Sequence, residues 1–375
     1  SMSTSATLVL ADGTFSAGTT YAATGSVFGQ LVFDTTMTGY QHSLTNPSNA
    51  ATIMVFTFPH IGNVGVNAGD AESEHYWPGG VVVRDPARIR SNWQAERDLN
   101  EVLTEANVVG VASVDTRALT RHIAAMGQVT AGIFAGEDAA DSDETLIAKV
   151  RDWTQPTAAT LVDTVSTHKT YAVEADNAQA TVALIDLGVR QATINQLVER
   201  GNTVQVMPAS TTAADIAAAG VDGVVLSSGP GNPADLADHI GLAQALLNAK
   251  TPLLGIGLGH QLIGLALGFE TYLLPQAQRG PNQPVYDVAS GQSLITSQNH
   301  AYALQAEQGT HAAPHADYGQ VTVTQYSLND NSVESLELTD LPVVTVQYYP
   351  ENSALETDEP HTVFDRFATL MATGE

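Results

Sequence analysis

Residues 251–268 of this chain read TPLLGIGLGHQLIGLALG, which is an apolar run, a glycine-rich turn and a second apolar stretch. The first run predicts a buried strand, and the stretch after the turn predicts a helix. A strand, a sharp turn and a helix in this order form a nucleophile elbow, which raises one side chain above the end of a parallel sheet. Gly257 stands at the tip of this turn and has no side chain to raise. The sequence therefore predicts a catalytic turn without its reactive group.

An alternation of strands and helices continues through the second half of the chain. From Thr181 onward, apolar runs such as TVALIDLG and VDGVVLSSG alternate with helical stretches such as RQATINQLVERG. This alternation predicts an α/β fold with a doubly wound, mostly parallel sheet, helices on both faces and ligands at the carboxyl ends of the strands. The segments SSGPG (227–231) and GIGLGHQ (255–261) fall at such ends.

The first 150 residues follow a different pattern, with short alternating runs rich in Gly, Thr and Val. They predict strands joined by turns, with helices near 95–107 and 117–126. Residues 151–180 have no strong periodicity and are interpreted as a linker. We therefore expect a mixed β/α domain over residues 4–150, this linker, and the doubly wound domain over residues 181–375.

The composition limits the chemistry that the chain can perform. Its 375 residues are 43% hydrophobic, as in a globular protein, and the absence of cysteine excludes disulfides and any thiol nucleophile. A net charge of −26 opposes binding to nucleic acid and to anionic membranes, so we expect neither as a partner. No secretory signal pattern is recognised, which favours the cytoplasm. No metal-ligand spacing and no Walker-type loop is found, so no metal, cofactor or ATP site is expected.

Four motifs in a fixed order indicate a family: LSSGPGNP (226–233), GIGLGHQ (255–261), SQNHAYAL (297–304) and VQYYPE (346–351). Together they resemble the class I glutamine amidotransferase domain, in which the elbow reads G-I-C-L-G-H-Q and the last motif reads H-P-E. The N-terminal half is similar to the small subunit of carbamoyl phosphate synthase. That likeness rests on FDTTMTGYQHSLTNPS (33–48), FPHIGNVGVN (58–67), VVVRD (81–85) and VDTRALTR (114–121).

The resemblance implies an amidotransferase-like second domain, the synthase large subunit as partner, and a role in arginine or pyrimidine biosynthesis. Hydrolysis of glutamine needs a nucleophile, a base and donors for the oxyanion. By the resemblance, Gly257 takes the place of the nucleophilic cysteine, Tyr349 that of the histidine base and Glu351 that of the orienting carboxylate. A tyrosine, with a reference pKa of about 10, is protonated at neutral pH and is a poor base. We expect glutamine hydrolysis to be lost, with Tyr349 able to hydrogen-bond Glu351.

The resemblance also implies a glutamine pocket, in which Gly229 and Leu258 would supply the backbone N–H groups of an oxyanion hole. The pocket positions are Ser48, Leu258, Gln261, Asn299, Ala301 and Tyr302. Ala301 and Tyr302 replace a glycine and a phenylalanine of the family. Gln261 and Asn299 also have a purely structural interpretation, as capping or turn residues. Glutamine or another small molecule is therefore a candidate ligand, and a decayed pocket is the alternative.

Three functions stay open from the sequence. The first is a small subunit without glutaminase activity that serves as scaffold and regulatory partner of an ammonia-using large subunit. The second is a stand-alone pseudoenzyme whose former active site binds glutamine or another small molecule. The third is an engineered inactive enzyme. A redesign without cysteine would explain Gly257 but not Tyr349, because deliberate inactivation rarely changes a histidine to tyrosine as well.

Overall fold

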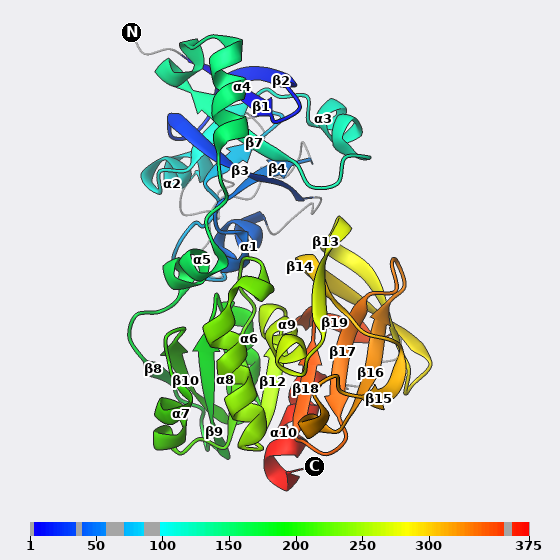
Figure 1. Cartoon of the computed structure of the whole chain (residues 1–375). Coiled ribbons are helices and arrows are strands. Elements are labelled where there is room, and N and C mark those ends of the chain that lie inside the picture. Colours follow the sequence, from blue (N-terminus) through cyan, green and yellow to red (C-terminus); the bar gives the residue numbers. More distant parts are fainter. Residues whose placement is uncertain (1–3, 35–39, 58–70, 86–97, 356–361, 375) are drawn as a thin grey trace. The chain divides into compact units, whose positions relative to one another are not determined.

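The computed structural model describes residues 4–34, 40–57, 71–85, 98–355 and 362–374. The chain forms two compact units, residues 1–156 and 157–375 (Figure 1). The segment 151–180, which the sequence predicts as a linker, contains the end of α4, helix α5 (Ala158–Val165) and strand β8 (Tyr171–Val173). Helix α5 buries Ala158, Leu161, Val162 and Val165, a spacing that places all four on one helical face.

Unit 1 is a closed barrel with the strand order β1-β2-β6-β5-β4-β3-β7. Its strands are β1 (Ser5–Leu10), β2 (Phe15–Thr20), β3 (Gly25–Asp34), β4 (Thr52–Phe56), β5 (Gly80–Val82), β6 (Val109–Ala112) and β7 (Thr130–Ala135). Strands β3, β4, β5 and β6 pair in parallel, and the other pairs are antiparallel. A cluster of fully buried aliphatic side chains from several strands fills one core, among them Leu8, Ile53, Val82, Val111 and Ile133.

Short helices complete unit 1. They are α1 (Tyr40–Thr45), the 3-10 turn η1 (Pro47–Asn49), α2 (Leu99–Glu105), α3 (Thr116–Ile123), the 3-10 turn η5 (Gly136–Ala140) and α4 (Asp143–Asp152). The expected mixed β/α character is confirmed; α2 lies in the first stretch predicted to be helical, and α3 overlaps the second and begins one residue before it. Residues 95–97 of the first stretch and the motif FPHIGNVGVN (58–67) lie outside the described residues.

Unit 2 is built on one long sheet whose first half is parallel, as predicted. Strands β10 (Asn202–Pro208), β9 (Ala180–Asp186), β11 (Gly223–Leu226), β12 (Leu253–Ile256) and β18 (Val343–Val346) are neighbours in this order and pair in parallel. Strand β11 and β12 are buried at every residue, as expected for parallel strands covered on both faces. Strand β8 pairs antiparallel with β10 at the edge.

The second half of the sheet is antiparallel, which the alternating pattern of residues 181–268 did not predict. It consists of β13 (Glu270–Asp287), β14 (Gln292–Gln305), β15 (Gly309–Ala312), β16 (Gln320–Ser327), β17 (Val333–Leu338) and β19 (Tyr349–Leu355). Two register shifts interrupt the ladder between β13 and β14. Strand β13 contains Pro275, Pro281 and Pro284, and proline cannot donate to a ladder, so interruptions of this kind are expected there.

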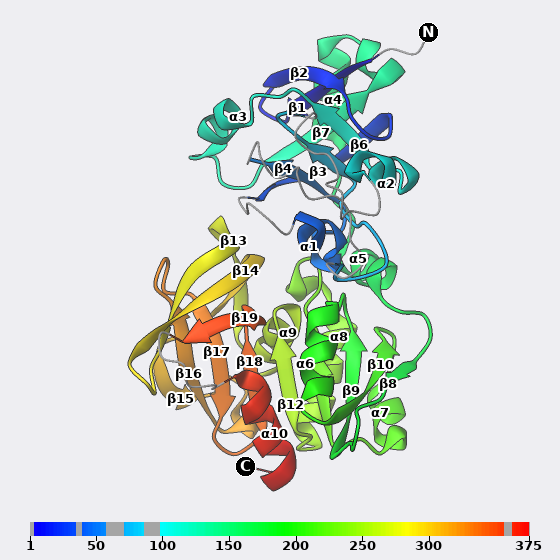
Figure 2. The ribbon, with the colours of Figure 1, turned by 180° about the vertical axis from the view of Figure 1, so that it is seen from behind.

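Helices cover both faces of the sheet, which confirms the doubly wound arrangement. One core is formed with α5, α7 (Ala213–Ala219), α8 (Ala237–Asn248) and α9 (Leu258–Ala266), and Figure 1 looks onto α8 and α9. The opposite core is formed with α6 (Gln191–Glu199) and α10 (Val363–Thr373), and α10 lies in front in Figure 2. The 3-10 turns η6 (Pro233–Asp235) and η7 (Ala316–Tyr318) complete unit 2. Within the described residues, none of the helices is both long and apolar enough to span a membrane.

Candidate functional site

The predicted elbow is present between β12 and α9. Gly257 is the residue that precedes α9, with φ 56° and ψ −110°. Its N–H donates to the Val346 carbonyl (2.9 Å), and its own carbonyl accepts from the Gln261 N–H (3.1 Å). A positive φ is strained for residues with a Cβ and unstrained for glycine, so the tip conformation suits the residue that occupies it. The turn is therefore intact, and no side chain projects from its tip.

At two further positions around this turn, the neighbouring backbone comes so close that only glycine fits. A Cβ on Gly259 would lie 2.0 Å from the Leu226 carbonyl oxygen, and a Cβ on Gly229 would lie 2.1 Å from the Leu187 carbonyl oxygen. Both distances are far inside van der Waals contact, so any side chain would push these segments apart. The Gly229 position also lies against Leu258, whose Cδ2 would be 3.0 Å from that Cβ. The structure thus brings Gly229 and Leu258 together beside Gly257.

Arg190 contacts both Tyr349 and Glu351, two of the predicted site residues. Its guanidinium carbon lies 3.9 Å from the centroid of the Tyr349 ring, and its Nη1 donates to Glu351 Oε2 (3.1 Å). Thr193 Oγ1 donates to the other carboxylate oxygen of Glu351. Arg190 is the N-cap of α6 and Thr193 lies in its first turn, where the helix dipole also favours a carboxylate. Arg190 and Thr193 thus each bind one carboxylate oxygen of Glu351.

Gln261 links three of the sequence motifs through the hydrogen bonds of its side-chain amide. Its Nε2 donates to the Tyr302 carbonyl (2.8 Å) and to Gln347 Oε1 (2.9 Å). It lies on α9, Tyr302 on β14, and Gln347 just before β19. Its side-chain amide is therefore used in the framework of the site, which differs from the helix-capping interpretation of the sequence.

The segment Asn299–Tyr302 lies on β14 and presents two faces. Asn299 and Ala301 are half-buried, whereas His300 between them is buried. Asn299 Oδ1 accepts from Arg279 Nη1, across the ladder to β13. Asn299 is thus a ladder residue with an arginine partner.

Two histidines near the elbow are buried and neutral. Burial lowers the pKa of His260 to about 3, with a smaller effect of His300, and lowers the pKa of His300 to about 4. His260 Nδ1 lies 2.7 Å from Thr345 Oγ1. The ring nitrogens of His300 lie 2.8 Å from the Tyr302 carbonyl oxygen and 2.8 Å from Gln298 Oε1. Both rings are therefore fixed by internal contacts.

A buried acid lies on β17, beside the last motif. Glu334 is fully buried, and its carbonyl accepts from the Gln347 N–H (2.7 Å). Burial raises the pKa of its carboxyl group to about 8. The folded chain therefore holds this proton at a pH where the unfolded chain has released it. Its contribution to stability is present below about pH 4.5 and is lost as the pH rises through about 8.

The remaining predicted residue, Ser48, belongs to unit 1 and lies in η1. Its N–H donates to Asn46 Oδ1 (3.1 Å), which makes Asn46 the N-cap of this turn. Thr193, Arg279 and Glu334 were missed from the sequence. Among the described residues no three His, Cys, Asp or Glu side chains are grouped so that they could hold a metal ion.

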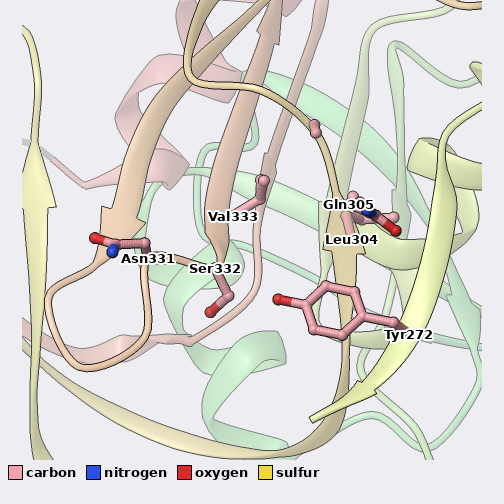
Figure 3. Close-up of a pocket in the computed structure, with 7 residues that line it drawn as sticks. Tyr272, Leu304, Gln305, Asn331, Ser332 and Val333 are labelled. Carbon is pink, nitrogen blue, oxygen red and sulfur yellow. The ribbon is translucent and has the colours of Figure 1, made fainter.

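A pocket of about 300 Å³ lies elsewhere in unit 2, where β13 and β14 face the turn before β17 (Figure 3). The hydroxyl groups of Tyr272 and Ser332 point into the same space, with Asn331 at its margin. None of the residues that line it is a predicted site residue. Burial raises the pKa of Tyr272, so this hydroxyl stays protonated.

Comparison with known proteins assigns both halves of the chain. Residues 8–133 match the family model "Carbamoyl-phosphate synthase small chain, CPSase domain", and residues 183–370 match "Glutamine amidotransferase class-I". Curated relatives named carbamoyl phosphate synthase small chain align over nearly the full length. The protein of Streptomyces avermitilis is 45% identical over 367 residues, covering 98% of this chain and 96% of that protein.

The chain belongs to the carbamoyl phosphate synthase small chain family. A further relative of that name, from Bifidobacterium longum, is 42% identical over 382 residues, covering 98% of this chain and 94% of that protein. The protein of Mycobacterium tuberculosis is 42% identical over 374 residues, covering 98% of each chain. The chain is thus a carbamoyl phosphate synthase small chain with an amidotransferase domain whose elbow carries Gly257.

Proposed function

We propose that this small chain does not hydrolyse glutamine and serves as the scaffold and regulatory partner of a large synthase chain that uses free ammonia. The observation that carries the proposal is the tip of the elbow, where Gly257 has a positive φ and no side chain. A covalent route to ammonia needs a nucleophile at that point. Without one, the oxyanion donors have no tetrahedral intermediate to stabilise.

The base position supports the same conclusion. The Tyr349 ring lies under the Arg190 guanidinium, which also binds Glu351. The side chain at this position is therefore a phenol held against a cation, with no imidazole nitrogen to accept a proton. The nearby histidines do not replace it, because both are buried with lowered pKa values and are held in internal contacts.

The proposed partner follows from the names of the relatives, which are small chains of a synthase. We place the complex in the cytoplasm, with its product entering arginine or pyrimidine biosynthesis. The retained fold of the amidotransferase unit supports a structural task. Close backbone packing at Gly229 and Gly259 persists although the chemistry at Gly257 is missing.

Co-expression with the large chain from the same genome tests the proposal. The complex should purify together and make carbamoyl phosphate from ammonia, with glutamine supporting no more synthesis than a glutamine-free control. The variant Gly257→Cys/Tyr349→His, assayed in the same complex, asks whether the two substitutions alone account for the loss. Glutamine-dependent synthesis by the wild-type complex would refute the proposal. Absence of any complex would favour a stand-alone binding protein.

A further inference from the structure

Another pocket of unit 2, of about 720 Å³, lies beside α10 on the face of the sheet that carries α6 and α10. Helix α10 packs against β18 with its apolar face (Figure 2), and the neighbouring stripe of its surface, with Arg366 and Thr369, lines the pocket. Strands β14, β16, β17 and β18 and the turn after β13 form the other walls. Pockets of this volume are typical of small-molecule sites, and no predicted site residue lines this one. The pocket is therefore a candidate site separate from the elbow.

The floor of this pocket is apolar. Leu294 of β14, Val344 and Val346 of β18 and the ring of Tyr348 line it, and all four belong to the core cluster on this face of the sheet. The Tyr348 hydroxyl donates to Gln325 Oε1 (2.7 Å), which fixes the ring in place and satisfies its polar end. A flat apolar group of a ligand would gain free energy by leaving water for this floor.

The rim of the pocket carries an excess of negative charge. Asp287, Glu337 and Asp365 line it, and Arg366 is the cation among the lining residues that the structure describes. Arg366 is paired with Glu337 (2.6 Å), and Asp365 is paired with Arg200 (3.1 Å). Two of the three carboxylates therefore already have a cation of the chain beside them.

Asp287 is the third carboxylate, and its hydrogen-bond donors are neutral. Its Oδ1 accepts from Gln325 Nε2 (3.0 Å), and its Oδ2 accepts from the N–H (3.1 Å) and the hydroxyl (2.6 Å) of Ser290. Over the described parts of the chain, no arginine, lysine or histidine forms an ion pair with it. A carboxylate has about four lone-pair sites, so Asp287 keeps capacity for another donor. An ammonium group complements it best, because the hydrogen bond is then charge-assisted.

We propose that this pocket binds a small organic amine whose aromatic or other apolar body lies on the floor and whose ammonium group binds Asp287. A ligand that also carries a carboxylate is disfavoured, because Glu337 and Asp365 lie on the same rim and would repel it. The chemical class is therefore an arylalkylamine rather than an amino acid. The proposal does not rest on the proposed function, since the pocket contains no predicted site residue.

Isothermal titration calorimetry of the full chain at neutral pH tests the proposal with three related probes. Phenethylamine has the aromatic body and the ammonium group, 2-phenylethanol replaces the ammonium group by a hydroxyl group, and L-phenylalanine adds a carboxylate. We expect phenethylamine to bind below about 10 mM, and the other two to bind at least about tenfold more weakly, as expected for the loss of a charged hydrogen bond or the addition of a repelled charge.

Two variants locate the binding in this pocket. Asp287→Asn removes the charge and keeps the shape, and it should weaken phenethylamine binding by about tenfold. Thr369→Trp places a large side chain on the exposed part of α10 that lines the pocket, and it should abolish binding. Asp163→Asn is the matched control, since it removes an exposed carboxylate of unit 2 from α5 and should leave the affinity unchanged.

The proposal is overturned if phenethylamine shows no binding up to about 10 mM, or if 2-phenylethanol binds equally well. It is also overturned if Asp287→Asn or Thr369→Trp binds phenethylamine as tightly as wild type while its circular dichroism spectrum is that of the folded chain. Glutamine hydrolysis would refute the proposed function and would leave these calorimetric results unaffected.

Discussion

Replacing Arg190 with methionine removes the cation that joins Tyr349 to Glu351 and keeps most of the aliphatic stem. The Arg190 and Glu351 side chains are only 5% and 2% exposed, so the change leaves a buried carboxylate with Thr193 as its described partner. Removing one partner of a buried ion pair costs about 3–5 kcal/mol. Loss of the guanidinium over the ring adds about 1 kcal/mol. We expect Arg190→Met to lower the free energy of unfolding by about 4–6 kcal/mol.

Urea unfolding at neutral pH, followed by far-ultraviolet circular dichroism, measures this loss. Arg366→Met is the control, because Arg366 and Glu337 are 45% and 32% exposed and such a pair contributes less than about 1 kcal/mol. The double variant Arg190→Met/Glu351→Gln removes the stranded charge and should be more stable than Arg190→Met alone. An Arg190→Met loss no larger than that of the control would refute the buried network.

Further variants test the packing, the buried acid and the elbow. Gly259→Ala places a Cβ 2.0 Å from a backbone carbonyl oxygen and should cost about 3 kcal/mol or more in urea unfolding. Gly241→Ala on α8 meets nothing within 4 Å and should instead gain about 1 kcal/mol. With Glu334→Gln as reference, wild-type stability should fall as the pH rises from about 4.5 to about 8, and a flat difference in urea titrations across this range would contradict the raised pKa. Gly257→Cys alone should stay inactive in an ammonia-release assay and, with φ 56°, should cost about 1–3 kcal/mol of stability.

Local signals in the sequence predicted the elbow and the parallel half of the sheet. The apolar run of β12, the glycines of the turn and the apolar face of α9 are contiguous, so their pattern could be recognised without knowledge of the fold. Helix α5 was a missed local signal, because its buried residues have helical spacing. Its short length within a segment rich in Thr and Ala concealed this pattern.

The contacts that define the site were not predictable in the same way. Arg190 reaches Glu351 across 161 positions of sequence, and Arg279 reaches Asn299 through a hairpin with two register shifts. Glu351 is bound by Arg190 and Thr193 at the start of α6, residues that lie 161 and 158 positions before it in the chain. Pairing across strands and helices depends on the completed fold, which residue spacing does not specify.

The fate of the amide nitrogen of glutamine tests the central claim most directly. Glutamine labelled with heavy nitrogen at its amide is incubated with the complex of small and large chains, ATP and bicarbonate, with unlabelled ammonia present. The account predicts carbamoyl phosphate that contains only unlabelled nitrogen and glutamine that keeps its label. Labelled carbamoyl phosphate, or labelled ammonia released at an enzymatic rate, would contradict it, because an elbow with Gly257 at its tip would then be hydrolysing glutamine.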